Sequence, residues 1–258
     1  MWFFFVLSMS LGLYSQLEAK PAHRPPLLVH MMYFPWDRDQ HLLENEQNFD
    51  HQPYLEMQKR VQKDHGRVVM WTYSKAKNFC LKHYPKIWSV LQQHAARPVM
   101  YVDVLRWLVV YHFGGIYWQY HSIPLVESMT GFLPCNGKQI RLFTECILTQ
   151  EFAQQMAQNP IRRGEPEELV RVASQVFSCS TKKNKILRKL VDFLVTRVKK
   201  NKVHCDYDIL YISGNAGISE YYDQCMQHNP RVELVSLEET GKMINFNPKS
   251  SWRLDGRK

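Results

Sequence analysis

The sequence predicts an α/β domain in which a mixed sheet lies between helices. Short apolar runs alternate with helical segments, and a buried helix leads through two glycines into a strand. The 258 residues suit one such domain and are enough to bury a sizeable core. In open α/β sheets, ligands collect beyond the carboxyl ends of the strands. Polar residues at those ends are therefore the candidates for a functional site.

The first elements follow one another in strand–helix order. Residues 27–33 and 67–73 predict two strands, because both runs are apolar and rich in Val and Met. Ser74 is the expected N-cap of a helix that ends at His83, and Pro85 is expected to open the next helix. Alternation of this kind predicts a sheet covered by helices.

The stretch Pro98–Phe113 is apolar on nearly all sides, which predicts a buried helix. Two glycines at residues 114–115 are expected to end it, and residues 116–118 predict a short strand. Asp103 and Arg106 interrupt the apolar run three residues apart, so both side chains leave the same face. We expect them to point into a polar site at the strand end; the alternative is a core helix whose Asp and Arg pair with each other.

The second half of the chain continues the alternation and includes a strongly basic helix. That helix carries its lysines and arginines mostly opposite its leucines, so a solvated face is expected. Strands are expected at residues 140–149, 208–213 and 232–235, and helices at residues 151–158, 184–200 and 218–227.

Asp103 and Arg106, followed by Gly-Gly-Ile and Tyr117, resemble the sugar-binding region of the DxD glycosyltransferases. This family includes initiating α-mannosyltransferases, inositol-phosphoceramide mannosyltransferases and the clostridial glucosylating toxins. Its pattern continues with two acids after the tyrosine, whereas Gln119 and His121 stand at those positions here. The resemblance covers the sugar-contacting half of the motif and departs at the metal-binding half.

The resemblance implies a GT-A-like nucleotide-diphospho-sugar transferase fold and a set of site residues. In the family the two acids hold Mn²⁺ or Mg²⁺ against the diphosphate, so their replacement implies a weak Mn²⁺ site or a metal-independent one. The implied residues are Asp103, Arg106 and Tyr117 for the donor sugar, Trp71, Gln119, Ser251 and Trp252 for the nucleotide, and His121 and Asn247 for a metal.

Two further stretches show a looser likeness to the same family. Residues 168–179 are similar to a stretch that lines the acceptor side, and Ser213-Gly214-Asn215 is a loose variant of its Thr-Gly-Pro turn. The implied activity is transfer of a hexose from a UDP- or GDP-sugar to a glycan or glycolipid with retention. The alternative is a catalytically impaired protein that serves as a sugar- or nucleotide-binding module. No residue is identified as the nucleophile or the general acid.

The two ends of the sequence and its cysteines predict the domain boundaries and the cellular location. Residues 1–17 are apolar and predict a signal peptide or short signal anchor, residues 18–26 a stem, residues 27–252 the transferase domain, and residues 253–258 a tail. We therefore expect the secretory pathway, in particular the Golgi lumen, and membrane association through the N-terminal segment. Six cysteines are compatible with disulfides there.

The charge is basic, with 33 Lys and Arg against 24 Asp and Glu, a formal net charge of +9. A basic balance suits anionic ligands such as nucleotides. No basic run is interleaved with aromatic residues, so nucleic acid is not an expected partner.

Overall fold

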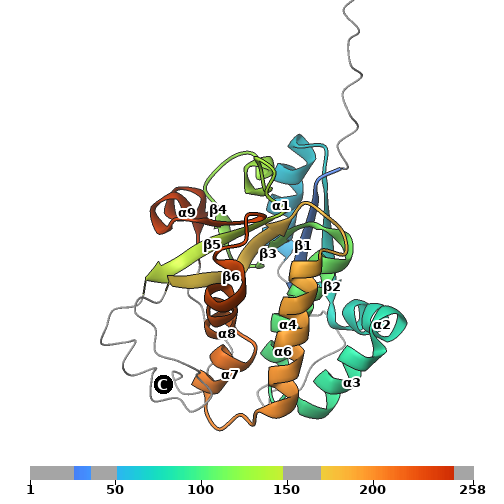
Figure 1. Ribbon diagram of the computed structural model, residues 1–258. Helices are drawn as coiled ribbons and strands as arrows, with labels where there is room; N and C mark the ends of the chain where they lie inside the picture. Colours follow the sequence, from blue (N-terminus) through green and yellow to red (C-terminus); the bar gives the residue numbers. More distant parts are fainter. Residues whose placement is uncertain (1–25, 36–50, 148–169, 247–258) are drawn as a thin grey trace, which may run out of the picture.

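The computed structural model describes residues 26–35, 51–147 and 170–246. Within these ranges a six-stranded sheet has the order β2-β1-β3-β6-β5-β7, and a second sheet pairs β4 with β8. Neighbouring strands of the large sheet are parallel, except that β6 runs antiparallel to both β3 and β5. Helices cover the sheet, so the predicted fold class, a mixed sheet between helices, is confirmed (Figure 1).

Most of the strands and helices that the sequence predicts fall close to their expected positions. The strands are β1 (Leu28–Tyr33), β2 (Arg67–Thr72), β3 (Gly115–Trp118), β4 (Ile123–Pro124), β5 (Ile140–Ile147), β6 (Val170–Cys179), β7 (Val232–Val235) and β8 (Ile244–Asn245). The helices are α1 (His51–Lys63), α2 (Tyr73–His83), α3 (Pro85–His94), α4 (Pro98–Phe113), α6 (Lys185–Lys200), α7 (Asp206–Ile212), α8 (Asn215–Tyr221) and α9 (Leu237–Met243). A 3₁₀ turn (Met129–Phe132) and a π turn (Tyr222–Met226) complete the set. The helix expected at residues 151–158 lies outside the described ranges.

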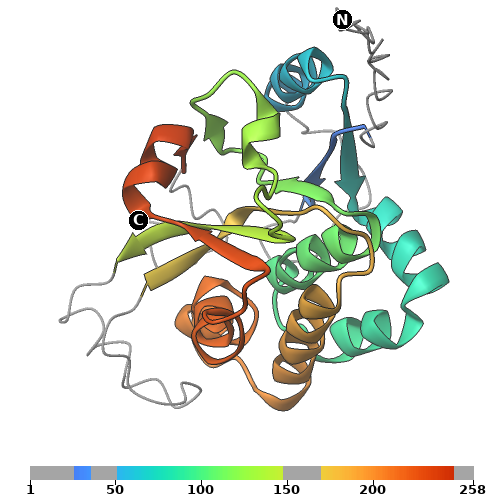
Figure 2. The ribbon, with the colours of Figure 1, turned by 45° about the horizontal axis from the view of Figure 1, so that its top comes forward.

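Two apolar clusters cover the two faces of the sheet. The larger cluster packs α2, α3, α4, α6, α7 and α8 against one face, and the smaller one packs α1 and the 3₁₀ turn against the other. Successive residues of β3 alternate between them, because Ile116 and Trp118 belong to the smaller cluster and Tyr117 to the larger. Figure 2 shows α1 and α9 on one side of the sheet and α4 and α6 on the other.

The junction between α4 and β3 requires both glycines. Gly114 has φ 71° and Gly115 has φ 91°, values that favour glycine. A Cβ on Gly115 would lie 2.3 Å from the carbonyl oxygen of Leu28 on the neighbouring strand. His30 Nε2 donates to the carbonyl oxygen of Gly114 over 2.9 Å. The glycines thus end the helix and bring β3 close against β1.

Two local predictions were wrong. Residues 208–213 do not form a strand, because most of them belong to helix α7 (Asp206–Ile212). Asp208 stabilises the start of this helix by accepting from the backbone N–H groups of His204 and Cys205. Helix α2 is capped by Thr72, whose side chain accepts from the N–H of Lys75, and the expected cap Ser74 lies inside the helix. A short apolar run fits a buried helix turn as well as a strand, and two neighbouring hydroxyls compete for one cap.

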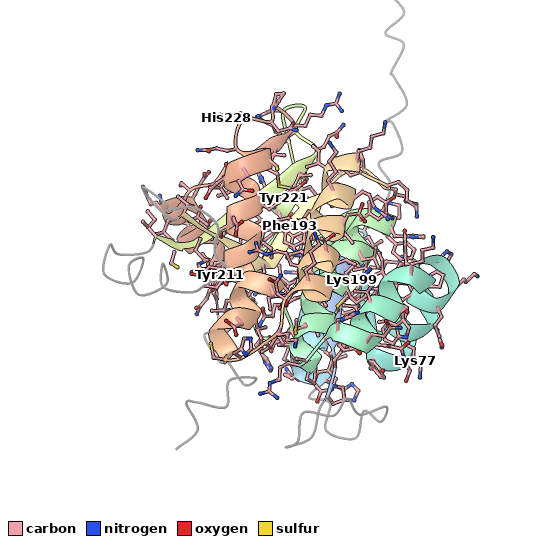
Figure 3. All side chains as sticks on the ribbon, turned by 60° about the horizontal axis from the view of Figure 1, so that its bottom comes forward. Lys77, Phe193, Lys199, Tyr211, Tyr221 and His228 are labelled. Atoms are coloured by element: carbon pink, nitrogen blue, oxygen red, sulfur yellow. The ribbon has the colours of Figure 1, made fainter. Side chains whose placement is uncertain are left out.

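The basic helix α6 forms as predicted, with Asn184 as N-cap, but one of its cations is not on a solvated face. Arg197 is buried and pairs with Glu220 over 2.8 Å. Beside this pair, the rings of Phe193 and Tyr221 lie 4.9 Å apart between α6 and α8 (Figure 3). The arginine therefore fastens the basic helix to α8.

The six cysteines form no disulfide in this structure: Cys80 and Cys179 are buried, Cys146 is half-buried, and Cys135, Cys205 and Cys225 are exposed. In the described part of the chain, every helix is too short or too polar to span a bilayer.

Candidate functional site

Asp103 and Arg106 lie on α4 and are both buried, with 4% and 5% of their surfaces exposed. The Arg106 guanidinium donates through Nη2 to Asp103 Oδ1, so the two form a buried ion pair. Pro98 is the first residue of α4, where the N–H group that proline lacks would have no partner within the helix. Asp103 and Arg106 therefore pair with each other, as the alternative interpretation expected. Both also form hydrogen bonds with residues outside α4.

Three separate segments meet at this pair. Arg106 Nη1 donates to the carbonyl oxygen of Ser174 on β6 over 2.8 Å and to its hydroxyl over 3.2 Å. Ser213, in the turn between α7 and α8, donates its hydroxyl to Asp103 Oδ2 over 2.9 Å. The sequence singled out all three segments for their likeness to one family. The structure joins them by hydrogen bonds on the side chains of one Asp and one Arg.

Tyr117 on β3 is the third residue of this cluster. The Arg106 guanidinium lies 5.3 Å from the centre of the Tyr117 ring, which also stacks on Phe177 at 5.4 Å. Burial raises the pKa of Tyr117, and the nearby Arg106 charge opposes the shift. Burial likewise raises the pKa of Asp103, against the opposing effects of Arg106 and the Ser213 hydroxyl. Sequence reasoning grouped these three residues, and the structure brings them together.

A second polar cluster next to the first was missed by sequence reasoning. Glu145 near the end of β5 accepts from Gln175 Nε2 on β6 over 2.8 Å and from Asn215 Nδ2 on α8 over 2.6 Å. Gln175 follows Ser174, and Asn215 lies two residues beyond Ser213, so the same two segments supply both clusters. Nothing in the sequence around Glu145 marks it, because its partners are 30 and 70 residues away.

Gln119 and His121 follow β3, at the carboxyl end of that strand. The backbone N–H of Gln119 donates to the carbonyl oxygen of Gln175 over 2.7 Å, so the strand pairing with β6 continues to this residue. His121 is exposed, and its ring lies 4.9 Å from that of Tyr120. Both side chains sit on the edge where the resemblance implies nucleotide and metal contacts.

These donors do not fit a Mn²⁺ ion held by the protein alone. Gln119 offers a neutral amide oxygen and His121 a neutral imidazole nitrogen, whereas hard divalent cations prefer carboxylate oxygens. Residues 26–35, 51–147 and 170–246 contain no group of three or more His, Cys, Asp or Glu side chains arranged to hold a metal ion. Asn247, the other residue that the resemblance implies for a metal, lies outside the described residues.

Trp71 lies in the core of the structure. It is 4% exposed, its Nε1 donates to His30 Nδ1 over 3.1 Å, and its ring packs 5.2 Å from that of Phe79. Lys75 places its ammonium 5.1 Å from the centre of the same ring. In this structure the Trp71 indole packs in the core at the end of β2. Two other nucleotide-binding candidates, Ser251 and Trp252, lie outside the described residues.

Comparisons with known proteins add little to this geometry. Scanned against protein families, the chain matches none, and no curated protein matches it. Among solved structures it is similar to "PaToxG Glycosyltransferase", with 16% sequence identity and a TM-score of 0.43 over 77% of this chain and 69% of that chain. A likeness this remote leaves the function to be argued from the chain's own residues.

Proposed function

We propose that this protein is a GT-A-like glycosyltransferase that binds a UDP- or GDP-hexose at the carboxyl edge of its sheet and transfers the hexose to a glycan or glycolipid. One observation carries the proposal. The D-x-x-R pair, the strand that holds Ser174 and the turn that holds Ser213 converge in one hydrogen-bonded cluster. These are the segments whose residue pattern resembles the DxD family. Retention of the anomeric configuration is taken from that resemblance alone.

In this proposal each residue of the cluster has a defined task. Asp103 accepts hydrogen bonds from hydroxyls of the donor hexose, and Arg106 fixes the carboxylate through a geometry that a lysine would not reproduce. Tyr117 supports the guanidinium from the strand. The leaving diphosphate carries concentrated negative charge, which cationic side chains must stabilise. The net charge of +9 favours such an anion near the domain.

A second candidate function is supported by a specific observation. Gln119 and His121 replace the two acids, so the site has two fewer negative charges with which to hold a metal. A protein that keeps the sugar contacts and lacks metal-driven turnover would be a sugar- or nucleotide-binding module. Turnover distinguishes the two functions: the transferase releases UDP or GDP from a bound donor, and the binding module does not.

We further propose that the chain enters the secretory pathway and acts in the Golgi lumen, because residues 1–17 match a signal peptide or anchor. Protease protection of the tagged full chain in microsomes tests this. Complete digestion of the tag without detergent would contradict it.

Binding of nucleotides tests the central proposal. Isothermal titration with UDP, GDP and their hexose conjugates, with and without Mn²⁺, should show binding of one nucleotide series by the unaltered protein. Failure to bind any of these compounds under either condition would overturn the proposal.

A double substitution tests the interpretation of Gln119 and His121. Changing Gln119→Asp together with His121→Asp restores two carboxylates on one strand end, and should tighten Mn²⁺ binding at least tenfold, which is about 1.4 kcal/mol. The matched control places one carboxylate at each of two exposed positions away from this edge, Gln224→Asp with His228→Asp. Tight Mn²⁺ binding by the unaltered protein, or an equal gain in the control, would contradict the interpretation.

A further inference from the structure

Glu145, Gln175 and Asn215 form a cluster in which the carboxylate fixes the orientation of both amides. Each amide nitrogen donates to a different oxygen of Glu145, over 2.8 Å and 2.6 Å. Turning either amide over would place its oxygen against the carboxylate, which accepts hydrogen bonds and cannot donate when ionised. The amide oxygens therefore point away from Glu145.

Those two amide oxygens have no hydrogen-bond partner among the residues that the structure describes. Gln175 Oε1 and Asn215 Oδ1 are both buried, and neither accepts a hydrogen bond from residues 26–35, 51–147 or 170–246. Buried polar atoms are nearly always hydrogen-bonded, so two unsatisfied acceptors on either side of one carboxylate are unusual. Each amide nitrogen also carries a second proton besides the one it gives to Glu145. The cluster thus offers acceptors and donors side by side.

We propose that these three residues bind hydroxyl groups of the hexose; the inference rests on the proposed function and extends it to a second set of sugar contacts. A hydroxyl both donates and accepts, so it matches an amide oxygen next to an amide N–H. A phosphate does not match, because its oxygens would meet the carboxylate and two acceptor oxygens. A metal cation matches poorly, because both carboxylate oxygens already accept amide protons.

The position of the cluster supports a sugar shared with the Asp103–Arg106 pair. β6 contributes Ser174 to Arg106 and Gln175 to Glu145. The segment that leads from α7 into α8 contributes Ser213 to Asp103 and Asn215, the first residue of α8, to Glu145. Two short segments therefore fix both clusters at once. A hexose has hydroxyls on several sides of its ring, which two neighbouring polar clusters can bind together.

The test compares a nucleoside diphosphate with its hexose conjugate. Gln175→Met and Asn215→Leu remove the amides at similar volume. In each variant, the affinity that the hexose adds to UDP or GDP should fall at least tenfold in isothermal titration, while UDP or GDP itself binds within about twofold of the unaltered protein. Gln224→Met is the control, because Gln224 also donates to a glutamate, Glu220, but is exposed.

A second variant keeps the test decisive if these two fail to fold. Glu145→Gln preserves the shape of the side chain and removes the charge that orients the amides, so the hexose contribution should again fall while UDP or GDP binding persists. Free hexoses observed by NMR provide an independent measurement, with loss of binding expected in all three variants.

The outcomes separate this inference from the proposed function. Equal losses for UDP and UDP-hexose would show a merely structural cluster and overturn the inference, as would an unchanged hexose contribution. Hexose binding that the variants abolish, without any nucleotide binding, would support the cluster and overturn the nucleotide-sugar donor. Binding of neither nucleotide nor hexose by the unaltered protein would overturn both.

Discussion

Asp103 and Arg106 are charged residues that the fold removes from water. With 4% and 5% of their surfaces exposed, each depends on the other and on a serine for compensation. A buried ion pair stabilises little relative to apolar side chains, yet removing one partner leaves an uncompensated charge. This residue pair therefore has a structural role whatever ligand it contacts.

Arg106→Ala should destabilise the fold by about 3–5 kcal/mol, because Asp103 would stay buried without its cation. Urea denaturation measures the change, with Arg188→Ala as control. Arg188 pairs with Asp192 on an exposed helix face, so its loss should cost no more than about 1 kcal/mol. A cost for Arg106→Ala similar to that of the control would show that the pair is not structural. Donor binding is better tested with Arg106→Lys, which keeps the charge and loses the fork.

His30 provides a pH-dependent contribution to stability. Its Nε2–H donates to Gly114 and its Nδ1 accepts from Trp71, so both nitrogens are satisfied only in the neutral ring. The pKa of His30 is lowered from 6.5 to about 4, mainly by burial and also by the charges of Lys75 and Arg67, while the hydrogen bond to the Gly114 carbonyl opposes the shift. A proton on Nδ1 would face the indole N–H.

The folded-state pKa of His30 is lowered, so the unfolded chain binds its proton first as the pH falls. The contribution to stability is fully present above pH 6.5 and is lost as the pH falls from 6.5 to about 4, on the order of 3 kcal/mol. His30→Gln should flatten the pH dependence of unfolding in this window. Comparing slopes is necessary because burial also lowers the pKa of His112 to about 4. Identical slopes for variant and unaltered protein would contradict the assignment.

The junction of α4 with β3 is the element that sets the site. Asp103, Arg106 and Tyr117 lie on the two sides of one tight connection, so the direction in which the helix returns to the sheet decides whether they meet. Gly115 allows β3 to approach Leu28 closely, and Gly114 accepts from His30. The two glycines suit the local backbone conformation, and Gly115 also permits the close contact with Leu28. Because the local and the long-range requirements favour the same residues, the sequence predicts this connection well.

Gly115→Ala should destabilise the protein by more than the cost of a positive φ alone. The new Cβ would lie 2.3 Å from the Leu28 carbonyl oxygen, and backbone cannot move as a side chain can. Gly137→Ala is the matched control, since Gly137 has φ 76° and no atom within 4 Å of an added Cβ. It should cost about 1–2 kcal/mol. Thermal unfolding compares the two, and equal losses would show that β3 and β1 can separate without penalty.

The molecule as a whole gathers its polar residues at one edge of the sheet. Five strands run parallel, so their carboxyl ends share an edge. The antiparallel β6 brings its middle residues Ser174 and Gln175 to the same edge. Helices α4 and α8, which pack on one face of the sheet, contribute Asp103, Arg106 and Asn215. The topology thus joins residues from five elements that no single stretch of sequence contains.

The sequence by itself determined the α/β class, the helix Pro98–Phe113, its glycine stop and the strand that follows. These depend on apolar periodicity and glycine conformation, which act between near neighbours. The same local evidence placed Asp103 and Arg106 on one face of that helix.

Only the tertiary structure decided three other matters. Residues 208–212 became helical because the Asp208 carboxylate accepts from backbone N–H groups at the start of α7 and Ile209 and Ile212 pack into the larger apolar cluster. A short apolar run leaves that outcome open. Trp71 became a core residue through its bond to His30, 41 positions away. Glu145 became part of a polar cluster because β6 and α8 bring amides to it from 30 and 70 residues away. Contacts between residues distant in sequence depend on how elements pack, which local pattern does not encode.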